Sequence, residues 1–266
     1  MKRFLLMMTV MMCGAIAASA QTGFEKKMLV AEGDTLLYRE LAPLSTFSKS
    51  KVPLVLFLHG AGERGNDNEA QLRHGAQMWL NPANRRKYPC WVLFPQCPAG
   101  KKWAFDEPVK SSVPSEMPVN ESPSEMMKFV RGLVWQYIKE KNVDPDRVYV
   151  IGLSMGGMAT FDMVSRFPSM FAAAVPICGA VNPKMLDKFN PKLIREVNFF
   201  IYHGDADPTV PVECSRAAYE KLVELKGKVD YTEFVGCEHN SWNPAFNQPD
   251  FMEQLFKCRR SHDEQK

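Results

Sequence analysis

A serine between two glycines occurs in a pattern that is typical of enzymatic nucleophiles. Residues 152–156 read Gly-Leu-Ser-Met-Gly, which matches the motif Gly-x-Ser-x-Gly with Ser154 at its centre. The motif follows the apolar run 148–151, which predicts a buried strand, and residues 157–166 have a helical pattern. A sharp turn between a strand and a helix holds a serine in a strained, exposed position. We therefore predict that Ser154 is a nucleophile.

The predicted nucleophile needs a base to take its proton, and histidine is the side chain most often used for this purpose. Three histidines follow Ser154 in the chain: His203, His239 and His262. His262 lies in a polar C-terminal tail, and His203 ends an apolar run, where we expect it to hydrogen-bond locally. His239 lies in a loop after the last predicted strand, where the chain order serine, acid, histidine places the base. We predict that His239 is the base.

An acidic side chain is needed to orient the imidazole of the base and to stabilise its charged form. It should follow the last strand but one, where residues 203–211 read His-Gly-Asp-Ala-Asp-Pro-Thr-Val-Pro. Asp205 and Asp207 both follow the turn at Gly204, so their spacing does not separate them. We expect one of them to orient His239 and the other to be solvated or to cap a loop.

Negative charge that develops on a substrate carbonyl oxygen needs hydrogen-bond donors, usually two backbone N–H groups. The first expected donor is the N–H of Met155, the residue after the nucleophile. The second should come from the loop after the third predicted strand, which reads His-Gly-Ala-Gly at residues 59–62. Small residues let the main chain approach a substrate closely, and we predict that Ala61 supplies this N–H.

Short apolar runs predict the strands that position these residues. Residues 26–30 and 35–41 predict an antiparallel hairpin that turns at residues 32–34 and forms an edge of the sheet. Continuous apolar runs are typical of strands that are buried on both faces of a parallel sheet. These runs lie at residues 52–58, 90–94, 147–153, 171–178, 197–203 and 229–235.

Helical patterns lie between the predicted strands. The clearest, at residues 124–141, has apolar residues with a period of about 3.6 and begins at Ser124, a suitable N-cap. Residues 157–166 and 212–225 are also predicted to be helical. This alternation indicates an α/β fold with a mostly parallel central sheet and helices on both faces. The Ser- and Pro-rich residues 110–123 are expected to form a surface loop over the carboxyl end of the sheet.

The first twenty residues have the pattern of a secretory signal peptide. Two basic residues precede the apolar run 4–17, which is too short to span a membrane, and small residues then offer a cleavage site near Ala20. We therefore predict export, either outside the cell or to a periplasm, with no stable membrane anchor. Residues 21–266 are expected to form a single catalytic domain with a sizeable core.

Charge and cysteine content limit the partners and cofactors of this chain. The 33 lysines and arginines nearly balance 30 aspartates and glutamates, which gives no electrostatic reason to expect nucleic acid as a partner. No Cys-x-x-Cys or His-rich cluster occurs at zinc spacing, so no metal is predicted. Six cysteines follow the predicted signal peptide, and the sequence does not choose between disulfides and buried free thiols: Cys90, Cys97, Cys178, Cys214, Cys237 and Cys258.

Five motifs in the chain fit one family pattern: residues 59–65 (His-Gly-Ala-Gly-Glu-Arg-Gly), 95–98 (Pro-Gln-Cys-Pro), 152–157 (Gly-Leu-Ser-Met-Gly-Gly), 203–211 and 239–242 (His-x-Ser-Trp). Together they resemble the phospholipase/carboxylesterase-like and feruloyl-esterase-like branch of the α/β-hydrolases, whose members are sometimes labelled predicted peptidases. The resemblance extends from about Lys51 to Trp242. It implies the α/β-hydrolase fold and ester hydrolysis. It also implies that Asp207, the second aspartate of the fourth motif, is the acid of the triad.

Four further residues are candidates for substrate contacts. Glu63 and Arg64 could contact substrate at the mouth of a cleft, although a mutual salt bridge or the anchoring of a loop is the more common role of such a pair. Trp103 and Trp242 could stack on a sugar or on an aromatic acyl group. Trp242 is the better candidate because it lies three residues from His239, whereas a tryptophan in the position of Trp103 more often only packs.

The lead hypothesis is a serine carboxylic ester hydrolase that forms an acyl-enzyme and needs no cofactor. Export and the family resemblance suggest small acyl or feruloyl esters of plant carbohydrate as substrates. A serine peptidase would use the same triad, but the chain has no propeller or other gating domain. A third alternative is a catalytically silent module that binds glycans, which would have no need for Ser154, Asp207 and His239 together.

Overall fold

The structure is a computed structural model that describes residues 23–260, with the exception of residues 32, 48 and 107–110. The predicted signal peptide, at residues 1–20, lies outside the described residues, so the prediction of export stays a prediction. The polar C-terminal residues 261–266, which include His262, also lie outside them.

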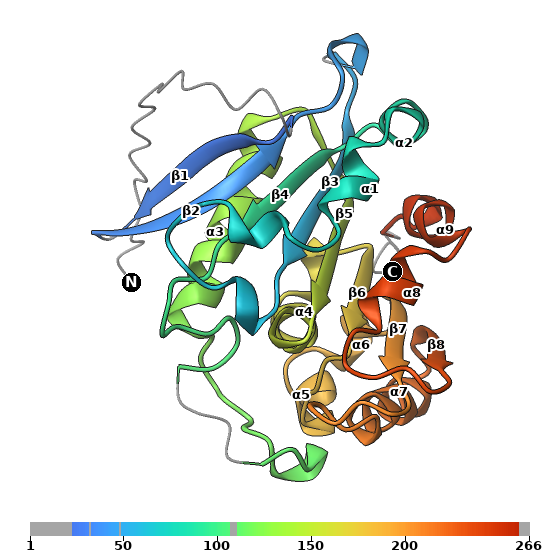
Figure 1. Cartoon of the computed structure of the whole chain (residues 1–266). Helices are drawn as coiled ribbons and strands as arrows, with labels where there is room; N and C mark the ends of the chain where they lie inside the picture. The colour runs from blue at the N-terminus through green and yellow to red at the C-terminus, as the bar shows by residue number, and fades with distance from the viewer. Residues whose placement is uncertain (1–22, 32, 48, 107–110, 261–266) are drawn as a thin grey trace, which may run out of the picture.

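Among the described residues, eight strands form one central sheet in the order β1-β2-β4-β3-β5-β6-β7-β8 (Figure 1). β1 and β2 form the predicted antiparallel hairpin at one edge, and β2 also pairs antiparallel with β4. All the remaining neighbours pair in parallel, which confirms the mostly parallel sheet. The strands are β1 (Glu25–Ala31), β2 (Asp34–Leu41), β3 (Val52–Leu58), β4 (Trp91–Pro95), β5 (Val143–Leu153), β6 (Ala173–Ile177), β7 (Asn198–Gly204) and β8 (Lys228–Phe234).

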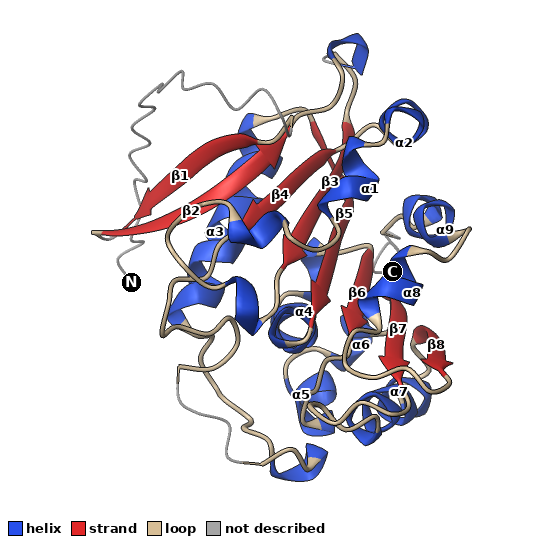
Figure 2. Ribbon diagram, viewed as in Figure 1, coloured by secondary structure: helices blue, strands red, loops and turns tan. Residues whose placement is uncertain are grey.

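Helices cover both faces of the sheet, as predicted (Figure 2). On one face α3, α4 and α7 pack against the strands, and on the other α1, α8 and α9 do so. The helices are α1 (Ala76–Leu80), α2 (Pro82–Lys87), α3 (Glu125–Glu140), α4 (Met155–Arg166), α5 (Pro183–Lys188), α6 (Pro191–Ile194), α7 (Glu213–Glu224), α8 (Trp242–Phe246) and α9 (Phe251–Lys257).

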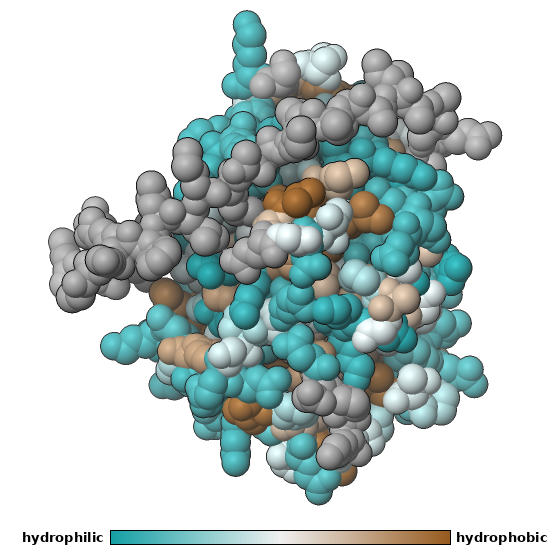
Figure 3. All heavy atoms as spheres, turned by 90° about the vertical axis from the view of Figure 1, so that its left-hand side faces the viewer, coloured by the Kyte–Doolittle hydropathy of each residue, from teal (hydrophilic) through white to brown (hydrophobic). Residues whose placement is uncertain are grey.

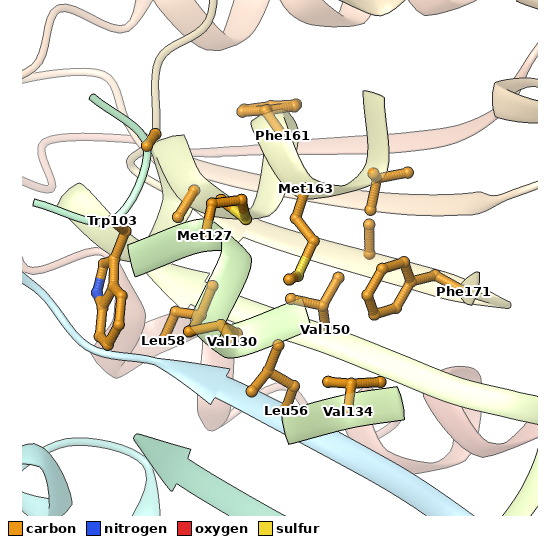
Figure 4. Packing of buried hydrophobic residues seen from close by; sticks show 14 of the residues in the cluster. Leu56, Leu58, Trp103, Met127, Val130, Val134, Val150, Phe161, Met163 and Phe171 are labelled. Atoms are coloured by element: carbon orange, nitrogen blue, oxygen red, sulfur yellow. The ribbon is translucent and has the colours of Figure 1, made fainter. Parts of the chain in front are cut away.

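The continuous apolar runs arise because each central strand serves two hydrophobic cores. Leu56 and Leu58 of β3 point to the core under α3 and α4, whereas Val55 and Phe57 point to the core under α1 and α8. Figure 4 shows the first core, where Leu56 and Leu58 lie beneath side chains of α3 and α4. Both faces of β3 therefore need apolar side chains, and each of its seven residues is buried.

Two strands differ most in length from their predictions. β5 begins at Val143 rather than at residue 147, and its pairing with β3 is irregular between Val52 and Leu54. β6 covers only Ala173–Ile177 of the predicted run 171–178, because Cys178 leaves the strand with a φ of 39°. The predicted loop at residues 110–123 contains a short 3₁₀ helix, η4 (Pro114–Glu116).

The surface around β1 and α3 is mainly hydrophilic, with hydrophobic residues exposed in small groups (Figure 3). On β1, the edge strand, Met28 and Val30 are about half exposed. Within the described ranges, no helix has both the length and the apolar character that crossing a bilayer requires.

The first turn of α4 packs directly against the ends of β3 and β5. A Cβ atom on Gly156 would lie 1.9 Å from the carbonyl oxygen of Leu58, and one on Gly152 would lie 2.1 Å from the carbonyl oxygen of Gly156. Only glycine fits at these two positions, because backbone atoms occupy the space of any side chain.

We predict that Gly156→Ala lowers the free energy of unfolding by more than about 2 kcal/mol, because the added methyl group meets backbone that cannot move aside. Urea denaturation measures this change. Gly62→Ala is the matched control, since its Cβ would meet nothing within 4 Å, and it should change stability by less than about 0.5 kcal/mol. Equal effects of the two substitutions would contradict the importance of this contact.

Candidate active site

Ser154 lies at the turn between β5 and α4 in a backbone conformation that is rare for residues other than glycine. Its φ is 55° and its ψ is −118°, outside the regions that L-residues ordinarily adopt. Its N–H donates to the carbonyl oxygen of Ile177, and its own carbonyl oxygen accepts from the N–H of Met158. These two bonds hold the strained residue in place at the start of α4.

The structure brings Ser154, His239 and Asp207 together in one hydrogen-bonded chain, although 85 residues separate the serine from the histidine. His239 Nε2 lies 2.9 Å from Ser154 Oγ, and His239 Nδ1 lies 2.7 Å from Asp207 Oδ2. The serine and the histidine are half-buried, whereas the carboxylate has no exposed surface. This is the geometry in which an imidazole can take a proton from a hydroxyl and share its positive charge with a carboxylate.

The structure separates the two aspartates that the sequence left open. Asp207 contacts His239, whereas Asp205 is exposed and accepts a hydrogen bond from the N–H of Gly236 at 2.7 Å. Burial acts to raise the pKa of Asp207, but hydrogen bonds from His239 and from the N–H groups of Thr209 and Val210 outweigh it. The pKa therefore lies below its usual value, and the carboxylate stays ionised at neutral pH.

His203 lies next to Asp207 and, as predicted, makes local contacts. Its Nε2 is 2.9 Å from the carbonyl oxygen of Val210 and 3.2 Å from Asp207 Oδ2, and its Nδ1 is 2.6 Å from Ser215 Oγ. Burial lowers its pKa, so the ring is neutral and holds the loop that carries Asp207.

The loop predicted to supply the second oxyanion donor lies against Ser154. A Cβ on Gly60 would be 3.6 Å from Ser154 Cβ. Ala61 is exposed at the start of a short 3₁₀ helix, η2 (Ala61–Glu63), and Met155 begins α4. In the described part of the chain, neither the N–H of Ala61 nor that of Met155 has a hydrogen-bond acceptor. Both N–H groups therefore remain available to a ligand.

Buried polar side chains hold the loop that follows β3 in place through hydrogen bonds. His59 Nδ1 lies 2.6 Å from the carbonyl oxygen of Gly60, and its Nε2 accepts from the N–H of Cys97 at 2.9 Å. Gln96 donates to the carbonyl oxygen of Glu63 and to Asp67, and it accepts from the N–H of Asn68. The segment after β4 thus supports the segment after β3, a role that the sequence analysis did not assign to His59 or Gln96.

The four candidate substrate contacts have different outcomes. Trp103 has no exposed surface and donates from Nε1 to the carbonyl oxygen of His59, so the prediction that it touches substrate is wrong and it packs instead. Arg64 anchors the loop by donating to the carbonyl oxygens of Ala61 and Lys101. Loop anchoring was one of the two roles expected of this pair. The other, a salt bridge with Glu63, does not form, because Glu63 pairs with Arg73 and His74 instead.

Two residues that the sequence analysis missed, Arg73 and His74, contact candidates that it named. Glu63 is buried, and its Oε1 lies 3.3 Å from Arg73 Nη1 and 3.6 Å from His74 Nε2. The His74 ring is 5.0 Å from the ring of Trp242, which is 5.7 Å from the ring of His239. Trp242 is half-buried in this contact, so the prediction that it contacts substrate stays open. His74 carried no motif of its own, which is why only the structure reveals it.

Cysteines near the site are free thiols. All six cysteines of the described residues are unpaired. Cys178 Sγ, a carboxylate oxygen of Asp207 and a ring nitrogen of His239 lie within 4.8 Å of one another, a spacing that could hold a metal ion. Burial raises the pKa of Cys178 to about 12, so its thiol is protonated at neutral pH and is a poor metal ligand.

The sequence and the fold have counterparts among known proteins. The chain belongs to the phospholipase/carboxylesterase family, whose model matches residues 45–252. A solved structure of a thermostable esterase has 34% sequence identity and a TM-score of 0.79, and the match covers 90% of this chain and 64% of that one. The resemblance stated from the motifs is therefore confirmed.

Two relatives known by sequence carry esterase names. Carboxylesterase SOBER1 of Arabidopsis thaliana is 27% identical over 220 residues, which cover 77% of this chain and 90% of that protein. NocK of Nocardia uniformis subsp. tsuyamanensis, assigned as an esterase, is 29% identical over 189 residues, which cover 70% of this chain and 49% of NocK. The chain thus spans about half the length of NocK and just under two thirds of the thermostable esterase.

Burial of His59 should make the stability of the protein depend on pH. This burial lowers the pKa of His59 to about 4, whereas the pKa of a histidine in the unfolded chain is about 6.5. The unfolded state therefore binds a proton first as the pH falls, so the free energy of unfolding decreases between about pH 6.5 and pH 4, by about 3 kcal/mol through this group. The contribution of His59 to the free energy of unfolding is fully present above about pH 6.5.

His59→Gln should flatten that dependence, which urea denaturation at a series of pH values measures. His74→Gln is the control, since His74 is only half-buried and should contribute less. Parallel pH profiles for wild type and His59→Gln would show that this imidazole is not the titrating group.

Proposed function

We propose that the chain is a serine ester hydrolase in which Ser154 is the nucleophile, His239 the base and Asp207 the acid. The observation that carries the proposal is the hydrogen-bonded chain Ser154–His239–Asp207. Its serine lies at the start of α4, just before Met155, and against the loop that contains Gly60 and Ala61. Nucleophile, base and oxyanion donors then lie in one place, and ester hydrolysis requires no other group.

In the acylation step, His239 Nε2 takes the proton of Ser154 as Oγ bonds to the carbonyl carbon of the ester. The carbonyl oxygen becomes negative and accepts hydrogen bonds from the N–H groups of Met155 and Ala61. The N-terminal end of α4 adds a favourable dipole at the same point. The charged imidazole, stabilised by Asp207, then gives its proton to the alcohol oxygen as that C–O bond breaks.

Deacylation repeats these steps with water. His239 takes a proton from a water molecule, whose oxygen attacks the acyl carbon on Ser154. The second tetrahedral intermediate uses the same two N–H groups. The imidazole returns a proton to Oγ as the acyl–serine bond breaks, which releases a carboxylic acid and restores the free enzyme.

The proposed substrates are small acyl or feruloyl esters of plant carbohydrate, processed by an exported enzyme. The signal-like pattern of residues 1–20 supports export, and the similarity of the motifs to feruloyl-esterase-like proteins supports this substrate class. The half-buried ring of Trp242, next to His239, offers a surface on which an aromatic acyl group or a sugar can pack.

Substitution of the triad tests the proposal. Ser154→Ala should lower kcat for p-nitrophenyl acetate by roughly 10⁵-fold or more and abolish labelling by a fluorophosphonate probe, while the protein stays folded. Asp207→Asn should lower kcat by roughly 10⁴-fold, because the base loses its orientation. Asp205→Asn is the matched control and should retain activity within a few-fold. A fully active Ser154→Ala enzyme would refute the proposed nucleophile, and a silent wild type would favour a binding module.

Substitution of Trp242 tests the substrate class. Trp242→Ala should lower kcat/KM for methyl ferulate about tenfold, which corresponds to the loss of one aromatic contact, but should change turnover of p-nitrophenyl acetate about twofold or less. Trp242→Phe should recover most of the ferulate activity. Equal losses on both esters would show that Trp242 supports His239 rather than the acyl group, and cleavage of a peptide anilide instead of esters would favour a peptidase.

A further inference from the structure

A buried carboxylate lies beside the loop that is proposed to bind the oxyanion. Glu63 ends the 3₁₀ helix η2, two residues after Ala61, and only 5% of it is exposed. A Cβ atom placed on Gly60 would lie 3.2 Å from Glu63 Oε2 and 3.6 Å from Ser154 Cβ. The carboxylate and the serine side chain therefore both adjoin Gly60.

A negative charge at this position opposes the proposed reaction. In both tetrahedral intermediates the former carbonyl oxygen becomes negative where it can accept from the N–H groups of Ala61 and Met155. Two like charges a few ångströms apart repel each other strongly where water is partly excluded. An uncompensated Glu63 carboxylate would therefore destabilise the charged transition states more than the neutral ester.

Two basic side chains of the segment before α1 contact this carboxylate. Arg73 Nη1 donates a hydrogen bond to Glu63 Oε1 at 3.3 Å, and His74 Nε2 lies 3.6 Å from the same oxygen. Burial lowers the pKa of His74, and the charge of Glu63 only partly offsets this effect, so the imidazole is neutral at neutral pH. The guanidinium of Arg73 stays protonated in proteins and is therefore the counter-charge of Glu63.

The backbone around Arg73 is held by contacts other than this ion pair. The N–H of Arg73 donates to the carbonyl oxygen of Ala70 at 3.0 Å. Gly75, two residues further on, has a φ of 76°, and a Cβ atom there would lie 2.6 Å from the ring of Phe57. The Arg73 side chain itself is 59% exposed. Replacement of its guanidinium should therefore change the charge beside Glu63 while the segment stays in place.

We propose that Arg73 promotes ester hydrolysis through Glu63. Its guanidinium neutralises the buried carboxylate, so that the oxyanion forms beside an ion pair rather than beside a lone negative charge. Arg73 touches no reacting atom in this role and is a positioning residue rather than a catalytic one. The inference rests on the proposed function, because it concerns the oxyanion of that reaction.

Steady-state kinetics with p-nitrophenyl acetate and p-nitrophenyl butyrate tests the inference. Arg73→Gln should lower kcat for both esters about tenfold at a nearly unchanged KM, because the repulsion acts on the transition state. This loss is smaller than the roughly 10²–10³-fold loss that follows removal of an oxyanion donor. Arg86→Gln removes an exposed positive charge from α2 and is the matched control, with activity like that of wild type.

Two further variants separate neutralisation of charge from structural support. Arg73→Lys keeps the positive charge and should recover most of the rate. Arg73→Gln combined with Glu63→Gln leaves no lone carboxylate, so kcat should return to within about threefold of wild type, a non-additive result that only coupled residues give. The double variant has no unpaired buried charge and stays informative if Arg73→Gln is unstable.

Three results would overturn the inference while the proposed function stands. These are full activity of Arg73→Gln, a double variant as slow as Arg73→Gln, or a loss that one ester shows and the other does not. The second would show that Arg73 supports the structure, and the third that it contacts the acyl group. A folded wild-type chain that hydrolyses neither ester would instead refute the proposed function, and this inference with it.

Discussion

The contact between the first turn of α4 and the ends of β3 and β5 determines where the rest of the site lies. Backbone meets backbone there, because Gly152 and Gly156 have no side chains to keep the segments apart. The helix therefore starts within one residue of the strand, and Ser154 must adopt its positive φ. The same approach brings the loop after β3 against the serine. The proposed nucleophile and the proposed oxyanion donors thus arise from one packing constraint rather than from separate features.

The polar residues of the family motifs act mainly as supports. His59 joins Gly60 to Cys97, Gln96 holds the segment from Glu63 to Asn68, and His203 holds the loop of Asp207. Each is buried and each is hydrogen-bonded, so their desolvation is compensated and the loops they hold are rigid. In such a site, the backbone N–H groups are oriented before any substrate arrives, which is the condition for electrostatic stabilisation of a transition state.

The sequence predicted the fold and the grouping of Ser154, Asp207 and His239 better than the surroundings of these three residues. Apolar runs identified the inner strands, because burial on both faces requires them, and chain order placed His239. The run at residues 229–235 was also interpreted as a strand buried on both faces, which is wrong, because none of the side chains of β8 is fully buried. Spacing did not separate Asp205 from Asp207, since that choice depends on contacts between distant loops. Short helices such as α2 and α5 escaped detection because they lack a full apolar period, although Asn followed by Pro at their starts is a usable signal. Burial of Trp103 and the position of His74 depend on tertiary packing that no local pattern records.

β8 is the last strand of the sheet, and none of its side chains is fully buried. The loop that carries His239 follows it directly and is tied to the Asp207 loop by bonds from Ala206 to Cys237 and from Gly236 to Asp205. Edge segments of this kind open locally at a lower free energy than the core. Warming would thus release the histidine from its aspartate while the inner strands remain folded. Inactivation by heat would then begin as a reversible local event, recovered on cooling, well below the temperature at which the molecule unfolds.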